Sequence, residues 1–190
     1  MLHKLLLFCG PSGSGKTTIV HHLLENDPRL AFSISATTRP KRATETDGVD
    51  YYFLTADEFR KRIANEEFVE WEEVYKDRYY GTLHSEIQRI WSEKKVAMFD
   101  VDVEGGLQIK KIFGDILLAV FVMPPSVEEL HHRLTDRQSE TKESLASRVA
   151  KSEHELSYAF RFDKVIINDK LADALLEAGK IVEEFLGASK

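Results

Sequence analysis

Residues 10–17 read Gly-Pro-Ser-Gly-Ser-Gly-Lys-Thr and complete the pattern G-x-x-x-x-G-K-[ST]. The apolar run Leu5–Cys9 precedes this pattern directly, as a buried strand would. Glycines allow backbone N–H groups to turn inward around a phosphate, and the helix that follows adds its positive N-terminal end. Lys16 is placed to reach the outer phosphates and Thr17 to bind Mg²⁺. The motif therefore predicts a strand, a phosphate-binding loop and a helix, which together bind a nucleoside triphosphate.

The length and composition predict one sizeable domain with room for a small insertion. The chain has 190 residues, of which 43% are apolar and 31% charged, and it has no low-complexity stretch. No apolar run approaches the ~20 residues of a membrane span. The single cysteine, Cys9, excludes an intramolecular disulfide. We therefore expect a soluble, cytoplasmic protein that is not bound to a membrane.

The charge distribution indicates which anions the chain binds. A formal net charge of −6 argues against the broad basic face that nonspecific nucleic-acid binding needs. Residues 37–42 nevertheless carry three cations and no acid, whereas residues 43–73 carry ten acids and three bases. A local cationic cluster of this kind is suited to a small phosphorylated ligand.

The order of expected elements is typical of a parallel α/β sheet with helices on both faces. A helix is expected over 16–25, strands over 30–35, 96–99, 116–123 and 165–167, and helices over 85–92, 126–134, about 142–156 and from about 171. Short apolar runs between residues 50 and 80, around a helical segment at 56–64, predict a small mixed sheet beside the main one. Ligands collect at the carboxyl ends of the strands in such sheets. Gly10, Ser35, Asp100, Pro124 and Asn168 lie at those ends.

Acidic and guanidinium side chains at these ends are candidates for phosphate chemistry. Asp100 follows a buried strand, where it is suited either to a Mg²⁺-linked role or to capping the next helix. Asp102 faces the same way if the backbone stays extended. Arg133, Arg137 and Arg148 flank the polar stretch 135–141, and guanidinium groups clamp phosphates.

Several longer motifs follow one another along almost the whole chain, and their order and spacing resemble those of the guanylate kinase family. They are Ser33–Arg42, Gly48–Phe53, Glu67–Trp71, Tyr79–Thr82, Asp100–Asp102 and Val165–Asp169. The resemblance implies a nucleoside monophosphate kinase of purine nucleotide metabolism. Such an enzyme transfers the terminal phosphoryl group of ATP to GMP with Mg²⁺ and gives ADP and GDP.

The resemblance also implies a role for each matching residue. The implied ATP-binding residues are Gly10, Pro11, Ser12, Gly13, Ser14, Gly15, Lys16, Thr17, Arg133, Arg137 and Asn168. Those implied for the GMP phosphate are Arg39, Arg42, Tyr51 and Tyr80, and those implied for the guanine are Ser35, Glu70, Thr82 and Asp102. Thr17 and Asp100 are the implied Mg²⁺ residues, directly or through water. Lys16, Arg39, Arg137 and Arg148 are the implied catalytic residues.

The chemistry of the bases supports the assignment of Glu70. Guanine presents two adjacent donors on its pairing edge, whereas adenine presents an acceptor beside a donor. A carboxylate only accepts hydrogen bonds, so Glu70 in a dry pocket favours guanine. Buried polar groups of this kind can reject a wrong ligand by up to ~10⁴-fold.

The family resemblance further implies a division of the chain into three parts. The core is expected at about 1–34, 83–125 and 158–190, the GMP-binding subdomain at about 35–82 and a mobile lid at about 126–157. Thr44, Glu104 and Gln138 depart from the family pattern. We expect Glu104 to add negative charge near the phosphates and Gln138 to stiffen the lid, so that the rate changes more than the reaction type.

Two other functions remain open from the sequence. One is a kinase for a different monophosphate, against which Glu70 argues. The other is a protein-binding scaffold of guanylate-kinase-like outline, although such modules typically lack a working phosphate loop. The sequence does not decide whether the chain forms a homo-oligomer.

Overall fold

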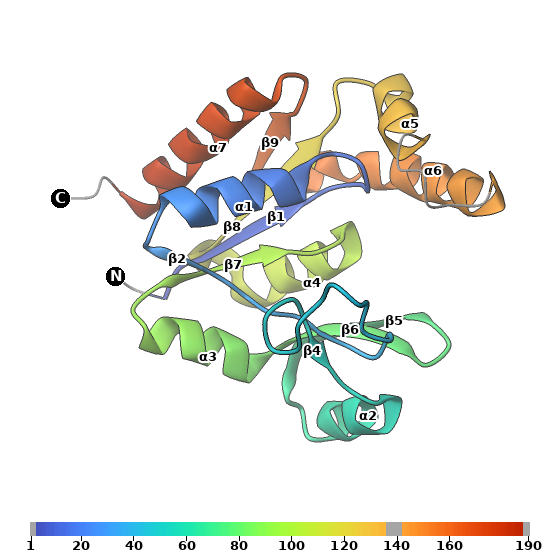
Figure 1. Ribbon diagram of the computed structural model, residues 1–190. Coiled ribbons are helices and arrows are strands. Elements are labelled where there is room, and N and C mark those ends of the chain that lie inside the picture. The colour runs from blue at the N-terminus through green and yellow to red at the C-terminus, as the bar shows by residue number, and fades with distance from the viewer. Residues whose placement is uncertain (1–2, 136–141, 188–190) are drawn as a thin grey trace.

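A computed structural model describes residues 3–135 and 142–187, with the side chains of residues 142–148 left out of the description (Figure 1). Two sheets organise this part of the chain. The first has five parallel strands in the order β2-β7-β1-β8-β9. Its strands are β1 (Leu5–Cys9), β2 (Leu30–Phe32), β7 (Val96–Asp100), β8 (Leu117–Met123) and β9 (Lys164–Ile167). The parallel sheet expected from the sequence is therefore confirmed.

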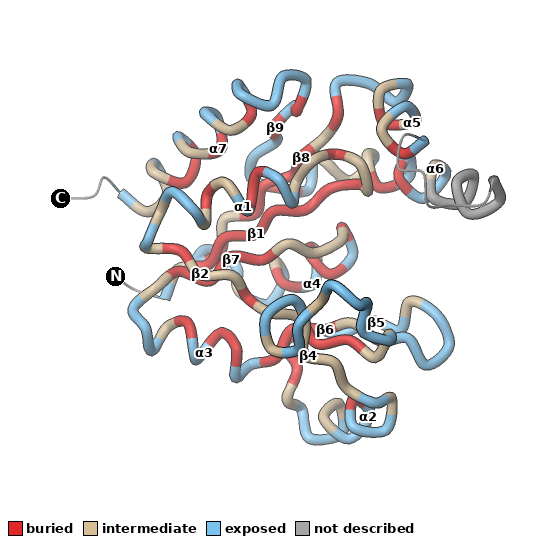
Figure 2. Tube along the Cα trace, viewed as in Figure 1, coloured by how far each residue is buried: buried red, intermediate tan, exposed pale blue. Residues whose placement is uncertain are grey.

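Helices cover both faces of this sheet, as Figure 1 shows. One face carries α1 (Lys16–Asn26) and α7 (Leu171–Leu186), and the other carries α3 (His84–Ser92) and α4 (Val103–Phe113). Side chains of β1 alternate between the two layers: Leu6 and Phe8 pack in the cluster of α1 and α7, whereas Leu5, Leu7 and Cys9 pack in the other. All five residues of β1 are fully buried, so this strand forms the centre of the core (Figure 2).

The second sheet is smaller and mixed, with the order β4-β3-β6-β5. It contains β3 (Ala36–Thr37), β4 (Tyr52–Phe53), β5 (Phe68–Tyr75) and β6 (Arg78–Leu83). Helix α2 (Ala56–Ala64) covers it through Phe59, whose ring stacks on Phe68 with centroids 4.2 Å apart. A capping box at Thr55 and Glu58 starts α2. This sheet has a core of its own.

The remaining helices lie beyond the carboxyl ends of β8 and β9. They are α5 (Val127–Thr135) and α6 (Lys142–Leu156), and short 3₁₀ turns occupy Gly114–Ile116 and Ala159–Arg161. His131 of α5 contacts Glu153 of α6, with Nε2 and Oε1 2.9 Å apart. In Figure 1 these two helices stand over the same end of the main sheet as the phosphate loop.

Three expectations about elements were wrong in detail. The expected strand 30–35 ends at Phe32, because the N–H of Ile34 donates to the Glu86 carboxylate at 3.1 Å rather than to a strand. No bounds were assigned to helix α4, although a cap for a following helix was one interpretation of Asp100, since Gly105 and Gly106 weaken the helical signal. Residues 68–75 form one strand instead of two short runs, and it pairs with β6, a strand that was not expected.

The glycines of α4 have a packing reason. A Cβ on Gly106 would lie 3.3 Å from Leu7 Cδ2 and 3.4 Å from Cys9 Cβ. The absence of side chains lets the helix start lie close against β1. Tertiary packing thus overrides the local propensity of this segment.

Candidate active site

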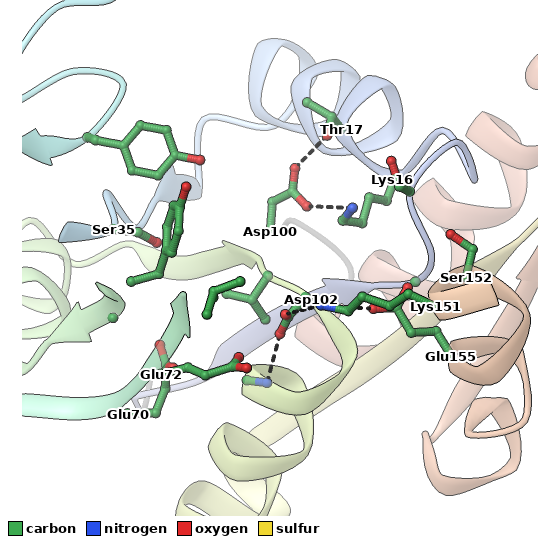
Figure 3. Close-up of a pocket in the computed structure, with 18 of the residues that line it drawn as sticks. Lys16, Thr17, Ser35, Glu70, Glu72, Asp100, Asp102, Lys151, Ser152 and Glu155 are labelled. Atoms are coloured by element: carbon green, nitrogen blue, oxygen red, sulfur yellow. Dashed lines mark hydrogen bonds and ion pairs between the residues drawn. The ribbon is translucent and has the colours of Figure 1, made fainter. Parts of the chain in front are cut away.

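A cavity of about 500 Å³ opens at the carboxyl ends of β1 and β7, between the two sheets and α6 (Figure 3). Parallel strands place their carboxyl ends at one edge, where the connecting loops form a crevice. Its lining residues are Gly10, Ser12, Lys16, Thr17, Ser35, Tyr51, Glu70, Glu72, Val74, Tyr75, Tyr80, Gly81, Asp100, Val101, Asp102, Gly105, Lys151, Ser152 and Glu155. The cavity therefore joins the phosphate loop to the second sheet.

The loop between β1 and α1 has a conformation that only glycine accepts at two positions. Gly10 has φ +149° and a Cβ there would lie 2.1 Å from the carbonyl oxygen of Val122. Gly15 has φ +87° and a Cβ there would lie 2.3 Å from Asn168 Nδ2. The Ser14 hydroxyl is buried and has no hydrogen-bond partner among the described residues. Together with the N-terminus of α1, these features form a cradle suited to phosphate oxygens.

Lys16, Thr17 and Asp100 meet at one end of the cavity. The Thr17 hydroxyl donates to Asp100 Oδ2 at 2.7 Å, and Lys16 Nζ lies 3.8 Å from Asp100 Oδ1. Asp100 Oδ1 is buried and accepts no hydrogen bond in the described part of the chain. A hydroxyl and a carboxylate are oxygen ligands of the type Mg²⁺ takes, alongside substrate phosphates. These residues fit a Mg²⁺ ion bound with a triphosphate.

Asn168 supports the phosphate loop from behind. The side chain is 5% exposed and its Nδ2 donates to the Ser14 carbonyl at 2.8 Å. The backbone carbonyl of Asn168 accepts from Arg133 Nη2 at 3.0 Å, while Arg133 Nε donates to Glu129 at 2.7 Å. Neither Asn168 nor Arg133 lines the cavity described here, so their roles toward ATP remain predictions.

Glu70 forms the floor of the other end. It belongs to β5, is 8% exposed and lies opposite Thr82 of β6, whose hydroxyl donates to Glu70 Oε1 at 2.7 Å. Burial raises the pKa of Glu70, and the nearby charge of Asp102 acts in the same direction, while the Thr82 hydroxyl opposes them. A Cβ on Gly105 would come within 3.5 Å of Glu70 Oε2, so the glycine keeps the carboxyl uncovered.

Asp100 and Asp102 both line the cavity but have different partners. Asp102 is the N-cap of α4, and its Oδ1 accepts from the Gly105 N–H at 3.0 Å. Its Oδ2 lies 3.6 Å from Lys151 Nζ. The cap that the sequence left open for Asp100 thus belongs to Asp102. Asp100 faces the phosphate loop and Asp102 faces Glu70 and α6 (Figure 3).

The cationic segment 37–42 lies beside the cavity. Arg39 pairs with Glu45, with Nη1 2.7 Å from Oε2, and its guanidinium carbon lies 4.8 Å from the centroid of the Tyr51 ring. The Arg39 guanidinium holds the pKa of Glu45 at about 2. Tyr51 and Tyr80 line the cavity with ring centroids 6.2 Å apart, whereas Arg39 and Arg42 do not line it.

Two predicted arginines cannot be placed. Arg137 lies outside the described residues, as does Gln138. Arg148 belongs to α6, but its side chain also lies outside the description.

The structure adds cavity residues that sequence reasoning missed. Glu72 follows Glu70 by two positions on β5, so strand alternation would have placed both on one face. One side of α6 contributes Lys151, Ser152 and Glu155, at spacings of one, three and four residues. This spacing is common on helices, so it did not predict a site in the sequence. We expected Glu104 to add negative charge near the phosphates. Its charge instead acts on Glu72 and Lys151, which line the Glu70 end of the cavity rather than the phosphate-loop end.

Comparisons with known proteins agree with this geometry. A family model described as guanylate kinase matches residues 2–186. The chain is 53% identical over 184 residues to the guanylate kinase of Bacteroides fragilis, covering 97% of this chain and 90% of that protein. It is 48% identical to the guanylate kinase of Porphyromonas gingivalis, covering 96% and 98%.

A solved structure of guanylate kinase from Anaplasma phagocytophilum is 25% identical, with a TM-score of 0.76 over 96% of this chain and 85% of that one. The similarity to guanylate kinases thus extends along nearly the full chain, including the phosphate loop, the mixed second sheet and the residues of the cavity between them. This chain belongs to the guanylate kinase family.

Proposed function

We propose that this protein is an ATP:GMP phosphotransferase that forms ADP and GDP. The observation that carries the proposal is the single cavity that joins Lys16, Thr17 and Asp100 at one end to Glu70 and Asp102 at the other. One end suits the phosphates of a triphosphate, and the other suits a base that presents hydrogen-bond donors. A phosphoryl group moving between the two substrates would cross this cavity.

At the donor end, the loop of residues 10–17 holds the ATP phosphates with backbone N–H groups, and Lys16 neutralises the developing charge. Thr17 and Asp100 would hold Mg²⁺, directly or through water, and the ion supplies positive charge to the phosphates. The acceptor phosphate is already an anion, so the transfer needs no general base. Catalysis then consists mainly of positioning and charge neutralisation.

At the acceptor end, Glu70, Thr82, Asp102 and Ser35 read the base. Thr82 fixes Oε1 of Glu70, and each carboxylate oxygen keeps a further acceptor site for the N1–H and amino group of guanine. Adenine would place an acceptor lone pair against one of these oxygens. This mismatch inside a buried pocket gives the selectivity for GMP.

The GMP phosphate is assigned to the hydroxyls of Tyr51 and Tyr80 together with Arg39 and Arg42. Burial raises the pKa of Tyr51, so its hydroxyl stays a donor at neutral pH. Arg39 lies against the Tyr51 ring and keeps guanidinium hydrogens beyond those used by Glu45. Arg133, Arg137 and Arg148 are assigned to the transferred phosphate, and Asn168 to the adenosine side.

The same proposal covers the organisation of the chain. Its core comprises about 1–34, 83–125 and 158–190, the GMP-binding subdomain 35–82 and the lid 126–157. The subdomain range contains nearly all of the second sheet, and the lid range contains α5 and α6. Among the described residues, no helix is long and apolar enough to cross a membrane. We propose a cytoplasmic location for the enzyme.

A coupled assay of ADP release tests the function. ATP and Mg²⁺ are supplied with GMP, AMP or UMP in turn, and we expect rapid release with GMP alone. Equal rates with AMP or UMP would contradict the base-reading role of Glu70. No ADP release with any acceptor, together with retained peptide binding, would favour a scaffold.

A further inference from the structure

Lys151 reaches into the cavity from α6 and approaches the base-reading carboxylates. Its Nζ lies 3.6 Å from Asp102 Oδ2 and 3.8 Å from Glu155 Oε1 (Figure 3). About half of the side chain is exposed, with a relative exposure of 51%. The long aliphatic stem thus carries the ammonium across the gap between α6 and the start of α4.

Four carboxylates from three elements act electrostatically on this ammonium. They are Glu72 on β5, Asp102 and Glu104 at the start of α4, and Glu155 on α6. Burial lowers the pKa of Lys151, but these four charges outweigh it and leave the pKa raised. Burial raises the pKa of both Glu72 and Glu155, and the Lys151 ammonium opposes part of this rise, at Glu155 together with Lys16.

This concentration of acids opposes the binding of an anionic nucleotide. Without a cation, like charges within a few ångströms repel one another and the phosphate of the ligand. Burial and the charges of Asp102 and Glu104 raise the pKa of Glu72 to about 7, even with the opposing charge of Lys151. The ammonium of Lys151 offsets part of this charge at the centre of the group.

The contact with Asp102 also orients that carboxylate. Oδ1 is held by the Gly105 N–H, and Oδ2 faces Lys151 at a distance longer than a hydrogen bond. Both oxygens of the Asp102 carboxylate are therefore oriented, while Oδ2 can still accept hydrogen bonds from a base.

We propose that Lys151 is a positioning residue for the acceptor nucleotide. It orients Asp102 and offsets the surrounding carboxylates, and so increases the affinity for GMP without touching the transferred phosphate. The inference rests on the proposed function, because it assumes that the base lies between Glu70 and Asp102.

The test compares Lys151→Met, Lys151→Arg and wild type by steady-state kinetics and by calorimetric GMP binding without ATP. Loss of a partly exposed charge should raise KM and Kd for GMP by about fivefold to tenfold in Lys151→Met. The values of kcat and KM for ATP should change by less than about twofold, because only acceptor binding is affected. Lys151→Arg should restore most of the GMP affinity.

Three controls separate charge from structural damage. Lys180→Met removes an exposed lysine on α7, in the layer on the other face of the main sheet, and should leave every parameter unchanged. An electrostatic effect should also shrink at about 0.5 M KCl, since salt screens exposed charges. Lys151→Gln, which keeps a polar tip, should reproduce the loss of Lys151→Met.

The outcomes distinguish this inference from the proposed function. If wild type phosphorylates GMP but Lys151→Met keeps its GMP affinity, or loses kcat and ATP affinity equally, the role of Lys151 is wrong. If wild type binds GMP without phosphorylating it, the kinase function fails, while the Kd series still decides the role of Lys151. If wild type does not bind GMP, both are wrong.

Discussion

Glu70 shows how the surroundings of one residue change its chemistry. In the sequence it is one of five acids within residues 66–73, and each would ordinarily be solvated. The strand pairing of β5 with β6 buries it beside Thr82, and burial raises its pKa. A buried acceptor with one fixed oxygen can discriminate between bases, which a solvated acid cannot.

We expect Glu70→Gln to reduce kcat/KM for GMP by about 10²-fold or more, because the amide places a donor against guanine donors. ATP affinity, measured by calorimetry, should be preserved. Glu73→Gln is the matched control: this exposed residue on the same strand accepts from the Asp77 N–H and can still do so as glutamine. An unchanged rate with GMP would eliminate the proposed contact.

Glu45 makes a different contribution at the same scale. It pairs with Arg39 and also accepts from the Arg42 N–H at 2.8 Å, so it organises the cationic segment. Its pKa falls from the ordinary 4.5 to about 2. A depressed pKa means that the pairing stabilises the fold above about pH 4.5 and that this stability is lost as the pH falls toward 2.

Accordingly, wild type should lose more stability than Glu45→Gln between pH 5 and pH 3, since the glutamine does not titrate. Urea unfolding at the two pH values measures the difference. Identical pH dependence in the two proteins would show that the pair does not contribute. At neutral pH, Glu45→Gln should also raise KM for GMP, because Arg39 loses its bidentate partner.

At the scale of elements, the loop between β1 and α1 depends on close backbone approach. Gly15 has a left-handed conformation against Asn168, which itself holds the Ser14 carbonyl. The strand, the loop and the start of α1 are therefore fixed by neighbours far away in sequence. A side chain at this position would displace either the loop or Asn168.

We expect Gly15→Ala to weaken ATP binding by at least about tenfold, through strain at φ +87° and a contact of 2.3 Å. GMP binding alone should be nearly unchanged. Gly179→Ala provides the opposite control, because a Cβ there meets nothing within 4 Å in helix α7. It should raise the free energy of unfolding by about 0.5–1 kcal/mol. Calorimetry with each nucleotide and urea unfolding measure these effects.

At the scale of the whole molecule, Glu86 joins the two sheets. This α3 residue is 2% exposed and accepts from the Ile34 N–H, from the Tyr52 hydroxyl at 2.8 Å and from Arg89 at 2.6 Å. Burial raises the pKa of Glu86, but these donors together lower it. The carboxylate thus fixes the link from β2 to β3 that positions Ser35 in the cavity.

Replacing Glu86 with alanine should lower the free energy of unfolding by about 2–4 kcal/mol, since it leaves the partly buried Ile34 N–H and Tyr52 hydroxyl without this acceptor. KM for GMP should rise more than KM for ATP, because the link leads to the acceptor end. Glu93→Ala removes a second, exposed carboxylate partner of Arg89 and should cost less than about 0.5 kcal/mol. Denaturation and kinetics of both variants test the assignment, and equal stability losses would refute it.

Local signals in the sequence were sufficient for the elements of the main sheet. Near-continuous apolar runs predicted β1, β7, β8 and β9, and the loop motif predicted α1. The bounds of helix α4 could not be predicted in this way, because Gly105 and Gly106 lower the helical propensity. The reason for these glycines is their close packing, Gly106 against β1 and Gly105 near Glu70, which only the folded chain shows.

The sequence by itself determined the parallel α/β fold and the phosphate loop, because these depend on local pattern and motif spacing, and its family resemblance implied several further residues that line the cavity. Only the tertiary structure decided which partner each acid has. Asp100 contacts Thr17 and Lys16, Asp102 caps α4 and faces Lys151, and Glu45 pairs with Arg39. These pairings depend on distances between segments far apart in the chain, and a linear pattern does not encode such distances. The phosphate loop therefore identifies the proposed donor site, whereas the packing of α4, α6 and the second sheet shapes the proposed acceptor site.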